Sequence, residues 1–286
     1  MIFTGPPQNI KRAPIEELFL EEARELGSKN GLDFSNCVVH APYIFNLAAS
    51  DSEDRFIHRL LVSEITRMVE MGIPYFIVHP GYHNGFSYEQ GIDNIVTNIK
   101  SVLEATKHLN YFFCLETMAG KSNQLGSKLE QLQEILERCS WDPKLAICLD
   151  TCHLHDAGYD LSKKEEFKEL VDRTVGLNRV KVLHLGDSMN PRGSAKDRHA
   201  NYGYGYIGWD TVLDWAYDPY FSTIPIIVET PYWRRKYLSK TGTEKVELIS
   251  PYKHEIGLLR SKKWEIISRK DCDPVFNIKI NLAKVS

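Results

Sequence analysis

The sequence predicts an α/β domain built as a parallel (β/α) barrel, and three observations lead to that prediction. Six short apolar runs rich in β-branched and aromatic residues each end on a residue type that binds metals. The ends of successive runs lie 34 to 45 positions apart, the length of a strand, a helix and a return loop. The stretches between the runs have helical periodicity. The six runs are Cys37–His40, Tyr75–His79, Tyr111–Glu116, Leu145–Asp150, Val180–His184 and Pro225–Glu229.

The stretches between these runs carry helix signals in order along the chain. Serines followed three positions later by Glu or Gln, the spacing of a capping box, predict helix starts near Ser50, Ser87 and Ser162. The segment 55–71 has apolar residues at helical spacing, and a last helix is predicted over 251–260.

The predicted barrel is one unit short at its beginning. With Met1–Phe3 taken as a strand fragment, seven strands precede the last helix, whereas a complete barrel of this class has eight. The tail segment Val275–Leu282 alternates in polarity as a strand does, and it could fill the vacant place or lie on the surface. We therefore expect a barrel domain over residues 1–263 and a C-terminal extension over 264–286, the latter a possible barrel-edge strand.

Composition and charge are those of an ordinary globular protein. The chain has 286 residues, of which 43% are hydrophobic and 26% charged. No apolar run approaches the roughly 20 residues that span a membrane, and no N-terminal signal is visible. The six cysteines are scattered without a Cys-x-x-Cys pair, which favours reduced, structural thiols. We expect an intracellular protein, cytoplasmic or nuclear depending on its source.

Metal-ligand residues are predicted to meet at one end of the barrel. All strands of a parallel barrel end on the same face, so the residues that close the six runs should converge there. Loop residues that follow the strands add three more candidates. One histidine alone is more often a core or surface residue, but nine candidates at such positions indicate a metal site. They are His40, His79, Glu116, Asp150, His153, His184, Asp197, His199 and Glu229.

The remaining histidines are assigned other places. His83 and His155 are expected in loop or supporting roles, because each is close in sequence to a candidate ligand. His58, His108 and His254 lie on or beside predicted helices and are interpreted as ordinary surface or core residues.

Seven short motifs carry a resemblance to a known family. They are His-Ala-Pro-Tyr (40–43) with Asn-Leu-Ala (46–48), His-Pro-Gly (79–81), Leu-Glu-Thr-Met-Ala-Gly (115–120), Cys-Leu-Asp-Thr-Cys-His (148–153), His-Leu-Gly-Asp-Ser (184–188), Asp-Arg-His (197–199) and Ile-Val-Glu-Thr (227–230). In this order they resemble endonuclease IV, a family of trinuclear-zinc apurinic/apyrimidinic endonucleases on a xylose-isomerase-like TIM barrel. The resemblance covers about residues 1–263, and the family's first βα unit and the tail have no counterpart.

The resemblance implies a DNA repair activity with assigned ligands. It implies hydrolysis of the phosphodiester bond 5′ to an abasic site and trimming of blocked 3′ ends. One zinc would be held by His40, His79 and Glu116, a second by Glu116, Asp150, His184 and Glu229, and a third by His153, Asp197 and His199. Glu116, as the bridging ligand, and Glu229, which would also orient the attacking hydroxide, are the expected catalytic residues. Mn²⁺ could replace zinc at one or more of these mixed sites.

The expected partner is double-stranded DNA with abasic or 3′-blocked lesions, bound by a monomer and without any membrane. A net charge of −3 lacks the basic character of most DNA-binding proteins, but three divalent ions would bring it to about +3. Tyr43 is a candidate wedge between bases. Gln8 stands where the family usually has an Arg, for which Lys11 or Arg12 could substitute, and Lys121 and Arg198 are candidate phosphate contacts.

Two other functions compete with this one. A sugar isomerase or epimerase on the related barrel would use one or two divalent metals, which leaves His153, Asp197 and His199 without a task. A catalytically silent DNA-binding barrel would have lost ligands, and none is missing from this chain. The endonuclease is therefore the favoured prediction.

Overall fold

The centre of the molecule is a curled sheet of six parallel strands. A computed structural model describes residues 1–238 and 244–265. The strand order is β1-β2-β3-β4-β5-β8, so each strand pairs with its predecessor in the sheet. The strands are β1 (Val38–His40), β2 (Tyr75–Val78), β3 (Phe112–Glu116), β4 (Leu145–Asp150), β5 (Val180–Leu185) and β8 (Ile226–Val228). All six predicted strands are therefore confirmed, each within two residues of its predicted ends.

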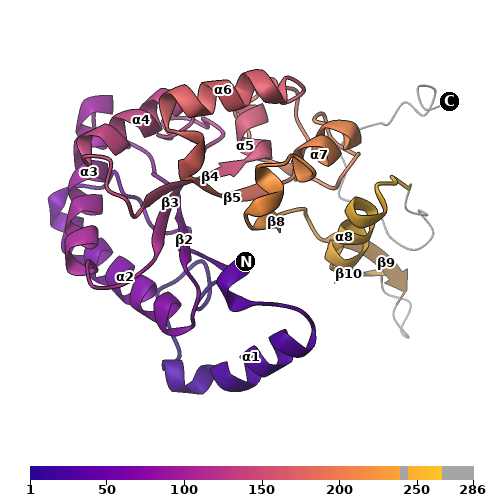
Figure 1. Ribbon diagram of the computed structural model, residues 1–286, viewed down its shortest axis with the longest axis horizontal. Helices are drawn as coiled ribbons and strands as arrows, with labels where there is room; N and C mark the ends of the chain where they lie inside the picture. The colour runs from indigo at the N-terminus through magenta and orange to yellow at the C-terminus, as the bar shows by residue number, and fades with distance from the viewer. Residues whose placement is uncertain (239–243, 266–286) are drawn as a thin grey trace.

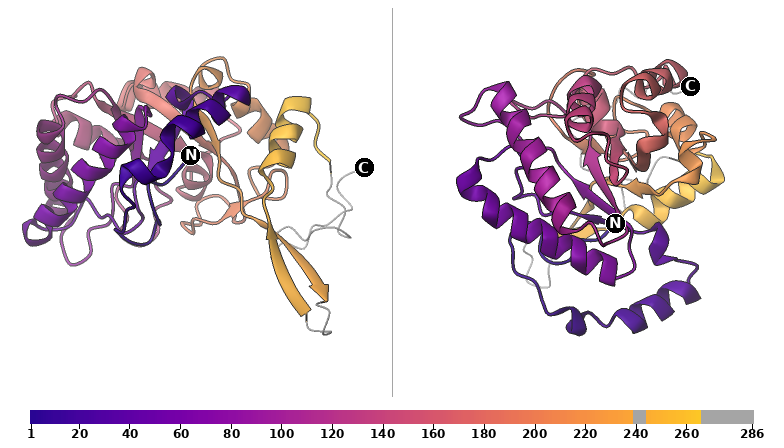
Figure 2. Two further views of the ribbon diagram at one scale, coloured as in Figure 1. Left: turned by 90° about the horizontal axis from the view of Figure 1, so that it is seen from below. Right: turned by 60° about the vertical axis from the view of Figure 1, so that its left-hand side comes forward.

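Helices cover the outer face of this sheet. In Figures 1 and 2 the helices α2, α3, α4 and α6 form an arc around the strands, as expected of a (β/α) barrel. The helices are α1 (Leu20–Lys29), α2 (Asp51–Glu70), α3 (Tyr88–Ala105), α4 (Leu129–Arg138), α5 (Thr151–Asp156), α6 (Lys164–Thr174), α7 (Trp209–Ala216) and α8 (Tyr252–Ser261). Short 3-10 turns lie at Ile15–Leu18, Phe34–Asn36, Leu177–Arg179 and Phe221–Thr223.

The predicted helix starts are correct at two of three places. α3 begins with the capping box formed by Ser87 and Gln90. α2 begins directly after Ser50. The start predicted at Ser162 is wrong by one residue, because α6 has Lys163 as its N-cap. The Ser162 hydroxyl instead donates to Asp160 Oδ1 at 2.6 Å, so it is engaged in the preceding turn.

Two apolar layers hold the sheet in place. The larger core lies between the sheet and the helices and includes fully buried Leu61, Ile65 and Met68 of α2. Burying each such side chain stabilises the fold by about 1.5–3 kcal/mol. A smaller layer consists of the side chains on the inner face of the sheet: Val38, Ile77, Cys114, Ala146, Cys148 and Val182. These small and β-branched residues fill the interior beneath the C-terminal ends of the strands.

The N-terminal segment adds one parallel bridge beside β1. Ile2 N–H donates to Val38 O at 2.9 Å, and His40 N–H donates to Ile2 O at 3.0 Å. The predicted fragment Met1–Phe3 therefore occupies the place of a strand, reduced to a single bridge. Among residues 1–238 and 244–265, no strand pairs with the other edge of β8. The predicted strand Val275–Leu282 lies outside the described residues.

Two small antiparallel pairs stand apart from the main sheet. β6 (Asp187–Ser188) pairs with β7 (His199–Ala200). β9 (Trp233–Leu238) and β10 (Glu244–Ile249) form a hairpin that projects away from the body of the molecule (Figure 2). The sequence does not predict this hairpin, which contains the basic run 234–236.

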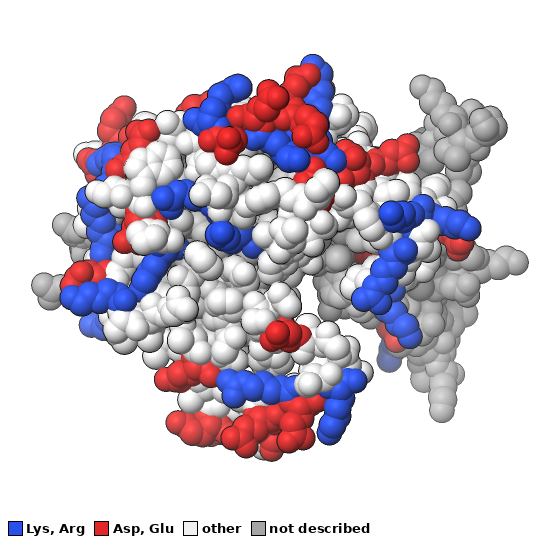
Figure 3. All heavy atoms as spheres, in the orientation of Figure 1, with Lys and Arg blue, Asp and Glu red and all other residues white. Residues whose placement is uncertain are grey.

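Charge is unevenly distributed over the face seen in Figure 3. Acidic side chains predominate over α1, which contains Glu21, Glu22 and Glu25, while Lys and Arg side chains gather near α8. No helix in the described part of the chain is long and apolar enough to cross a membrane.

Candidate metal centre

The two-residue period of the strands places the predicted ligands on the inner face of the sheet. Successive side chains of a strand point to opposite faces, so residues two apart share a face. His40, Glu116 and His184 each follow an inner-face residue by two positions, namely Val38, Cys114 and Val182. His79, Asp150 and Glu229 follow Ile77, Cys148 and Ile227 in the same way. The ligands thus continue the inner face just beyond the last apolar layer.

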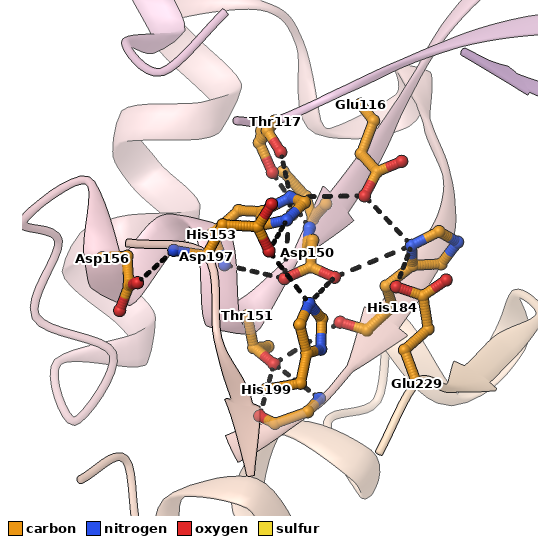
Figure 4. Close-up of polar contacts among 12 residues, drawn as sticks. Glu116, Thr117, Asp150, Thr151, His153, Asp156, His184, Asp197, His199 and Glu229 are labelled. Atoms are coloured by element: carbon orange, nitrogen blue, oxygen red, sulfur yellow. Dashed lines mark hydrogen bonds and ion pairs between the residues drawn. The ribbon is translucent and has the colours of Figure 1, made fainter. Parts of the chain in front are cut away.

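These side chains line a cavity of about 700 Å³ at the C-terminal ends of the strands. His40, His79, Glu116 and Glu229 lie in its wall, with His153, Asp197 and His199 from the loops. Asp150 and His184 lie deeper, with 0% exposure. All nine predicted ligand residues are therefore brought together, and seven of them are drawn in Figure 4.

A first cluster forms around one oxygen of Glu116. His40 Nε2 lies 3.1 Å and His79 Nε2 lies 3.3 Å from Glu116 Oε2. Glu116 is buried at the end of β3, between these two imidazoles from β1 and the loop after β2. The three residues have potential ligand atoms within 4.8 Å of one another.

A second cluster uses the other oxygen of the same carboxylate. His184 Nδ1 lies 3.2 Å from Glu116 Oε1, 3.3 Å from Glu229 Oε2 and 3.7 Å from Asp150 Oδ2. Glu116 therefore belongs to both clusters, which is the arrangement of a bridging ligand. The Cys148 thiol is also within 4.8 Å of Glu116 and His184. Burial raises the pKa of Cys148 to about 12, so it is a neutral thiol at neutral pH.

A third cluster is formed by residues from the loops. His153 Nε2 lies 3.1 Å from Asp197 Oδ1, and His199 Nε2 lies 3.7 Å from the same oxygen. Asp150 Oδ2 approaches His199 Nε2 at 3.9 Å, so the potential ligand atoms of Asp150, His153 and His199 also lie within 4.8 Å of one another. The third cluster thus includes Asp150 as well as the predicted Asp197.

Asp150 also organises the backbone. Its Oδ1 accepts the N–H of His153 at 2.7 Å and caps α5, which starts directly after β4. The Thr117 hydroxyl accepts the Asp150 N–H at 2.9 Å, and the Thr117 carbonyl lies 2.8 Å from His153 Nδ1. The strand-to-helix turn is therefore fixed by the same groups that present Asp150 and His153 to the cavity.

The loop that carries Asp197 is held by a buried carboxylate. Asp156 Oδ2 accepts the N–H groups of Lys196, at 3.2 Å, and Asp197, at 2.8 Å. Asp156 Oδ1 accepts the Ser188 hydroxyl at 2.7 Å. Asp197 has φ of +56°, a left-handed conformation that is uncommon outside glycine. These hydrogen bonds compensate for that backbone strain and aim the Asp197 carboxylate at His153 (Figure 4).

The charges and the burial of the clustered side chains shift the pKa values of the carboxylates in different directions. Burial alone would raise the pKa of Glu116, but His184 and His79 outweigh burial and hold it well below its usual range. Burial would also raise the pKa of Glu229, but His184 outweighs burial and lowers it to about 2. In Asp150 burial prevails, and its pKa is raised.

The pKa values of three imidazoles are raised, which favours their protonated form. Burial would lower the pKa of His199, but Cys152 and Asp150 raise it to about 10. Burial would also lower the pKa of His153, but Asp150 and Asp197 raise it well above its usual range. The carboxylates of Glu229 and Glu116 raise the pKa of His184 in the same way. Protons on these rings therefore compete with cations for the same nitrogen atoms.

The donor set fits divalent metal ions. Imidazole nitrogens and carboxylate oxygens are the ligands of zinc and manganese sites in proteins. Asp150 Oδ2, His184 Nε2 and His199 Nδ1 are buried without any hydrogen-bond partner. Buried polar groups without a partner are costly, and cations in this cavity would satisfy the carboxylate oxygen in particular.

The predicted DNA contacts occupy different places. Tyr43 is 52% exposed at the cavity rim, and its ring packs against His40 with centroids 5.2 Å apart. Arg198 is exposed and lines the same cavity. Gln8, Lys11 and Lys121 are exposed outside the cavity lining.

Arg12 has a different role from the one expected. Its Nε lies 2.6 Å from Glu64 Oε1, and only 10% of its side chain is exposed. The guanidinium also donates to the carbonyls of Asn9 and Lys11. Arg12 therefore ties the N-terminal loop to α2. Because its charge is already paired with Glu64, it does not present a free cation to a phosphate.

The other histidines lie outside the three clusters. His83 Nδ1 is 2.9 Å from the Phe86 carbonyl, within its own loop. His155 Nε2 is 3.1 Å from the Asn190 carbonyl and supports the loop after β6. His58 lies 3.0 Å from Ser101 Oγ between α2 and α3, and His254 packs its ring on Trp233. His108 is exposed after α3.

Three supporting carboxylates were missed in the sequence: Asp156, Asp187 and Glu255. Asp187 accepts backbone N–H groups from five residues of its own turn and of the loop 203–208. Glu255 accepts hydrogen bonds next to two ligand-bearing segments. The signal for Asp187 was its place in the motif 184–188. The signal for Glu255 was its spacing of three from buried Leu258 on α8.

Comparison with known proteins agrees with this geometry. A family model of the xylose isomerase-like TIM barrel matches residues 1–262. The probable endonuclease 4 of Acholeplasma laidlawii is 39% identical over 267 residues, which covers 93% of this chain and 86% of that protein. The probable endonuclease 4 of Geobacillus kaustophilus is 41% identical over 268 residues, with the same coverage of 93% and 86%.

Solved structures give the same result. Endonuclease IV from Thermus thermophilus is 26% identical with a TM-score of 0.72, covering 91% of this chain and 86% of that one. An L-ribulose 3-epimerase is 13% identical with a TM-score of 0.56, covering 91% and 75%, and at that identity it shows the shared fold alone. The ordered ligand motifs, the barrel and these similarities lead to one conclusion: the chain belongs to the endonuclease IV family of xylose isomerase-like TIM barrels.

Proposed function

We propose that this protein is a DNA repair endonuclease that hydrolyses the phosphodiester bond 5′ to abasic sites. The observation that carries the proposal is the convergence of nine His, Asp and Glu side chains at one cavity, in a chain of the endonuclease IV family. The family is metal-dependent, and the clusters could hold metal ions. The same cavity would trim blocked 3′ ends, because that reaction also hydrolyses a phosphodiester bond.

Three zinc ions per chain are the proposed cofactors, with Mn²⁺ as a substitute at one or more positions. His40, His79 and Glu116 would hold the first, and Glu116, Asp150, His184 and Glu229 the second. His153, Asp197 and His199 would hold the third. The distances within the three clusters support these sets, and the approach of Asp150 to His199 suggests that it supports the third as well.

Bound divalent ions would supply Lewis acidity to the phosphate oxygens and lower the pKa of water. The protein's own groups do the rest. Glu229 is 16% exposed at its side chain, so its carboxylate reaches the cavity and can accept a proton from an attacking water. Arg198 would pair with a phosphate at the rim. The exposed ring of Tyr43 would occupy the gap left by the missing base.

The sugar isomerase is less well supported. The epimerase similarity is at a level of identity that shows only the fold. His153, Asp197 and His199 form a cluster of their own, for which an enzyme with one or two metals has no use. The catalytically silent barrel is also disfavoured, because all nine residues are present and converge.

Incision of a duplex with a single abasic-site analogue is the direct test. The protein should cut 5′ to the lesion, leave a 3′-hydroxyl, need no added Mg²⁺ and lose activity in chelator. A 3′-phosphoglycolate end on the same duplex tests trimming. Turnover of ketose sugars without any cutting of the DNA would replace the endonuclease by the isomerase.

The number of metals can be tested with His199→Ala. The wild-type chain should contain close to three ions, mostly zinc, by elemental analysis. The variant should lose about one ion and most incision, because an ion that loses one of three protein ligands is bound much less tightly. His83→Ala is the matched control, since the His83 imidazole lies against the Phe86 carbonyl of its own loop and belongs to none of the three clusters. Full metal content and activity in His199→Ala would remove the third site.

A further inference from the structure

A buried carboxylate on the last helix lies just outside the ligand clusters. Glu255 of α8 is 1% exposed. In the part of the chain that the structure describes, no Lys, Arg or His forms an ion pair with it, and burial raises its pKa. A buried carboxylate without a cation is stable only when hydrogen bonds compensate for its lost hydration. Its hydrogen-bond partners therefore indicate why it is there.

Those partners come from two different segments. Glu255 Oε1 accepts the Asn201 side-chain amide at 2.9 Å and the Tyr202 N–H at 3.3 Å. Glu255 Oε2 accepts the Thr230 hydroxyl. The Asn201 amide also donates to the Pro231 carbonyl at 3.1 Å, which joins the two segments directly. One carboxylate thus connects α8, the loop after β7 and the end of β8.

Both segments carry candidate metal ligands. Asn201 lies two residues after His199, and Thr230 directly follows Glu229. The loop after β7 is also held on two other sides. Tyr202 OH donates to the Leu185 carbonyl at 2.9 Å, next to His184, and Trp264 Nε1 donates to the Tyr202 carbonyl at 2.9 Å. A loop anchored this way cannot move without changing the position of His199 relative to Glu229.

We infer that Glu255 is a positioning residue that fixes the distance between His199 and Glu229 and so controls how tightly the metal of the His199 cluster is retained. The inference rests on the proposed metal-dependent function. Glu255 does not line the cavity, and in the described part of the chain its hydrogen bonds go to Asn201, Tyr202 and Thr230, none of which is a candidate ligand. It acts through the backbone of Tyr202 and the side chains of Asn201 and Thr230.

Two substitutions of Glu255 separate the contribution of its hydrogen bonds from that of its negative charge. In Glu255→Gln, the amide oxygen can still accept from Asn201 and Tyr202. The new NH₂ group can donate to the Thr230 hydroxyl, which is able to accept as well as donate. Glu255→Ala leaves all three groups without a partner. Glutamine should therefore restore what alanine removes.

Hydrogen exchange of the metal-free protein is the first readout. In Glu255→Ala, amides of residues 199–204 and 228–230 should exchange at least tenfold faster than in the wild type. The amides of β2 and β3 should not change, and Glu255→Gln should resemble the wild type. Because no metal or DNA is present, this measurement holds even if the proposed nuclease activity proves wrong.

Metal retention is the second readout. After zinc loading, Glu255→Ala should release about one ion per chain to a chelator at least tenfold faster than the wild type, and its kcat should fall at least tenfold with KM within about threefold. Asp218→Ala is the matched control. Asp218 is also a fully buried carboxylate, and it accepts the backbone N–H groups of Tyr220 at 2.9 Å and Phe221 at 3.2 Å. It precedes β8, whereas Glu229 follows that strand, so Asp218 lies at the opposite end of the sheet from the ligands. Its replacement should lower the melting temperature and leave zinc release unchanged.

Three results would overturn the inference. They are unchanged exchange and zinc release in Glu255→Ala, a Glu255→Gln variant as defective as the alanine variant, or zinc release from Asp218→Ala as fast as from Glu255→Ala. If Glu255→Ala does not fold, Thr230→Val serves instead, because valine keeps the shape and removes only the hydroxyl donor. It should speed exchange at 228–230 and zinc release at least threefold, and wild-type rates in that variant would equally reject the role of Glu255.

Discussion

Single carboxylates in this protein perform two tasks at once. Asp150 caps α5 with Oδ1 and faces His184 and His199 with Oδ2. Glu116 divides its two oxygens between two clusters. Side chains of this kind link local backbone geometry to the cavity, so their substitution can be designed to affect one task and spare the other.

Glu229→Gln is expected to separate binding from turnover. Glutamine keeps the size of the side chain but cannot accept a proton from water, and the loss of such a group reduces rates by about 10²–10⁴-fold. The variant should therefore lose at least about two orders of magnitude in kcat while it still binds abasic duplex DNA. Single-turnover kinetics and a binding titration measure the two effects. A near-normal rate would exclude Glu229 from proton transfer.

Asp150→Asn should spare the fold and remove metal. Asparagine caps helices as well as aspartate does, so its oxygen can still accept the His153 N–H. Its NH₂ group replaces the oxygen that faces His184 and His199, and it cannot bind a cation. We expect a near-normal melting temperature for the metal-free protein together with the loss of one or more zinc ions. A large drop in the melting temperature of the metal-free variant would contradict this division of tasks.

The sequence revealed the residues that meet at the cavity better than the residues that support them. The convergence of the candidate ligands was predictable because the two-residue period of a strand fixes which face its last residue joins, as with Cys114 and Glu116. Asp156 and Glu255 were not, because their partners are backbone groups and loop side chains brought together only by folding. Arg12 was misjudged because its partner Glu64 lies far away in the sequence.

At the level of elements, strands were predicted more accurately than helix ends and additions. Each strand is a compact apolar run that is buried on both sides, a pattern with few alternatives. The start of α6 was displaced because Ser162 could bond in the preceding turn instead of capping the helix. The β9–β10 hairpin was missed because its first strand contains the basic run 234–236. Residues 245–248 of β10 do alternate between polar and apolar, but Val246 and Leu248 are exposed, so this pattern does not mark a buried strand.

The capping box of α3 gives a prediction at this scale. Ser87 accepts the Gln90 N–H, and Gln90 in turn accepts the Ser87 N–H. Ser87→Ala should lower the free energy of unfolding by about 1 kcal/mol, measured by urea denaturation of the metal-free protein. Ser63→Ala, the same change at a position inside α2, should have little effect because alanine favours helix. Equal effects of the two changes would mean that the cap contributes nothing specific.

At the scale of the whole molecule, bound metal should change how stability depends on pH. The pKa of His199 is raised to about 10 in the metal-free fold, and the pKa values of His153 and His184 are also raised. A raised histidine pKa stabilises the fold fully below the unfolded value of about 6.5, and this stabilisation is lost as pH rises through the folded value. The metal-free protein should therefore melt at lower temperature at about pH 9 than at about pH 6.5.

The zinc-loaded protein should show the opposite tendency. Its imidazoles have already lost their protons to bind metal, so acid and not base weakens the complex. Melting curves with and without chelator across roughly pH 6–9 compare the two forms. His199→Ala should flatten part of the metal-free dependence. Parallel pH profiles for the two forms would show that the cluster does not exchange protons for metal.

The way the ligands are distributed along the chain also determines when the centre can form. His40 ends the first strand of the sheet and Glu229 follows the last, so their meeting is a long-range contact that forms late in folding. Asp150 and His153, or Asp197 and His199, are close in sequence and can chelate zinc in an unfolded chain, with Cys152 as an additional thiolate. Zinc captured early by such fragments would be a kinetic trap. Refolding in chelator, with metal supplied only to the finished sheet, is the order that avoids it.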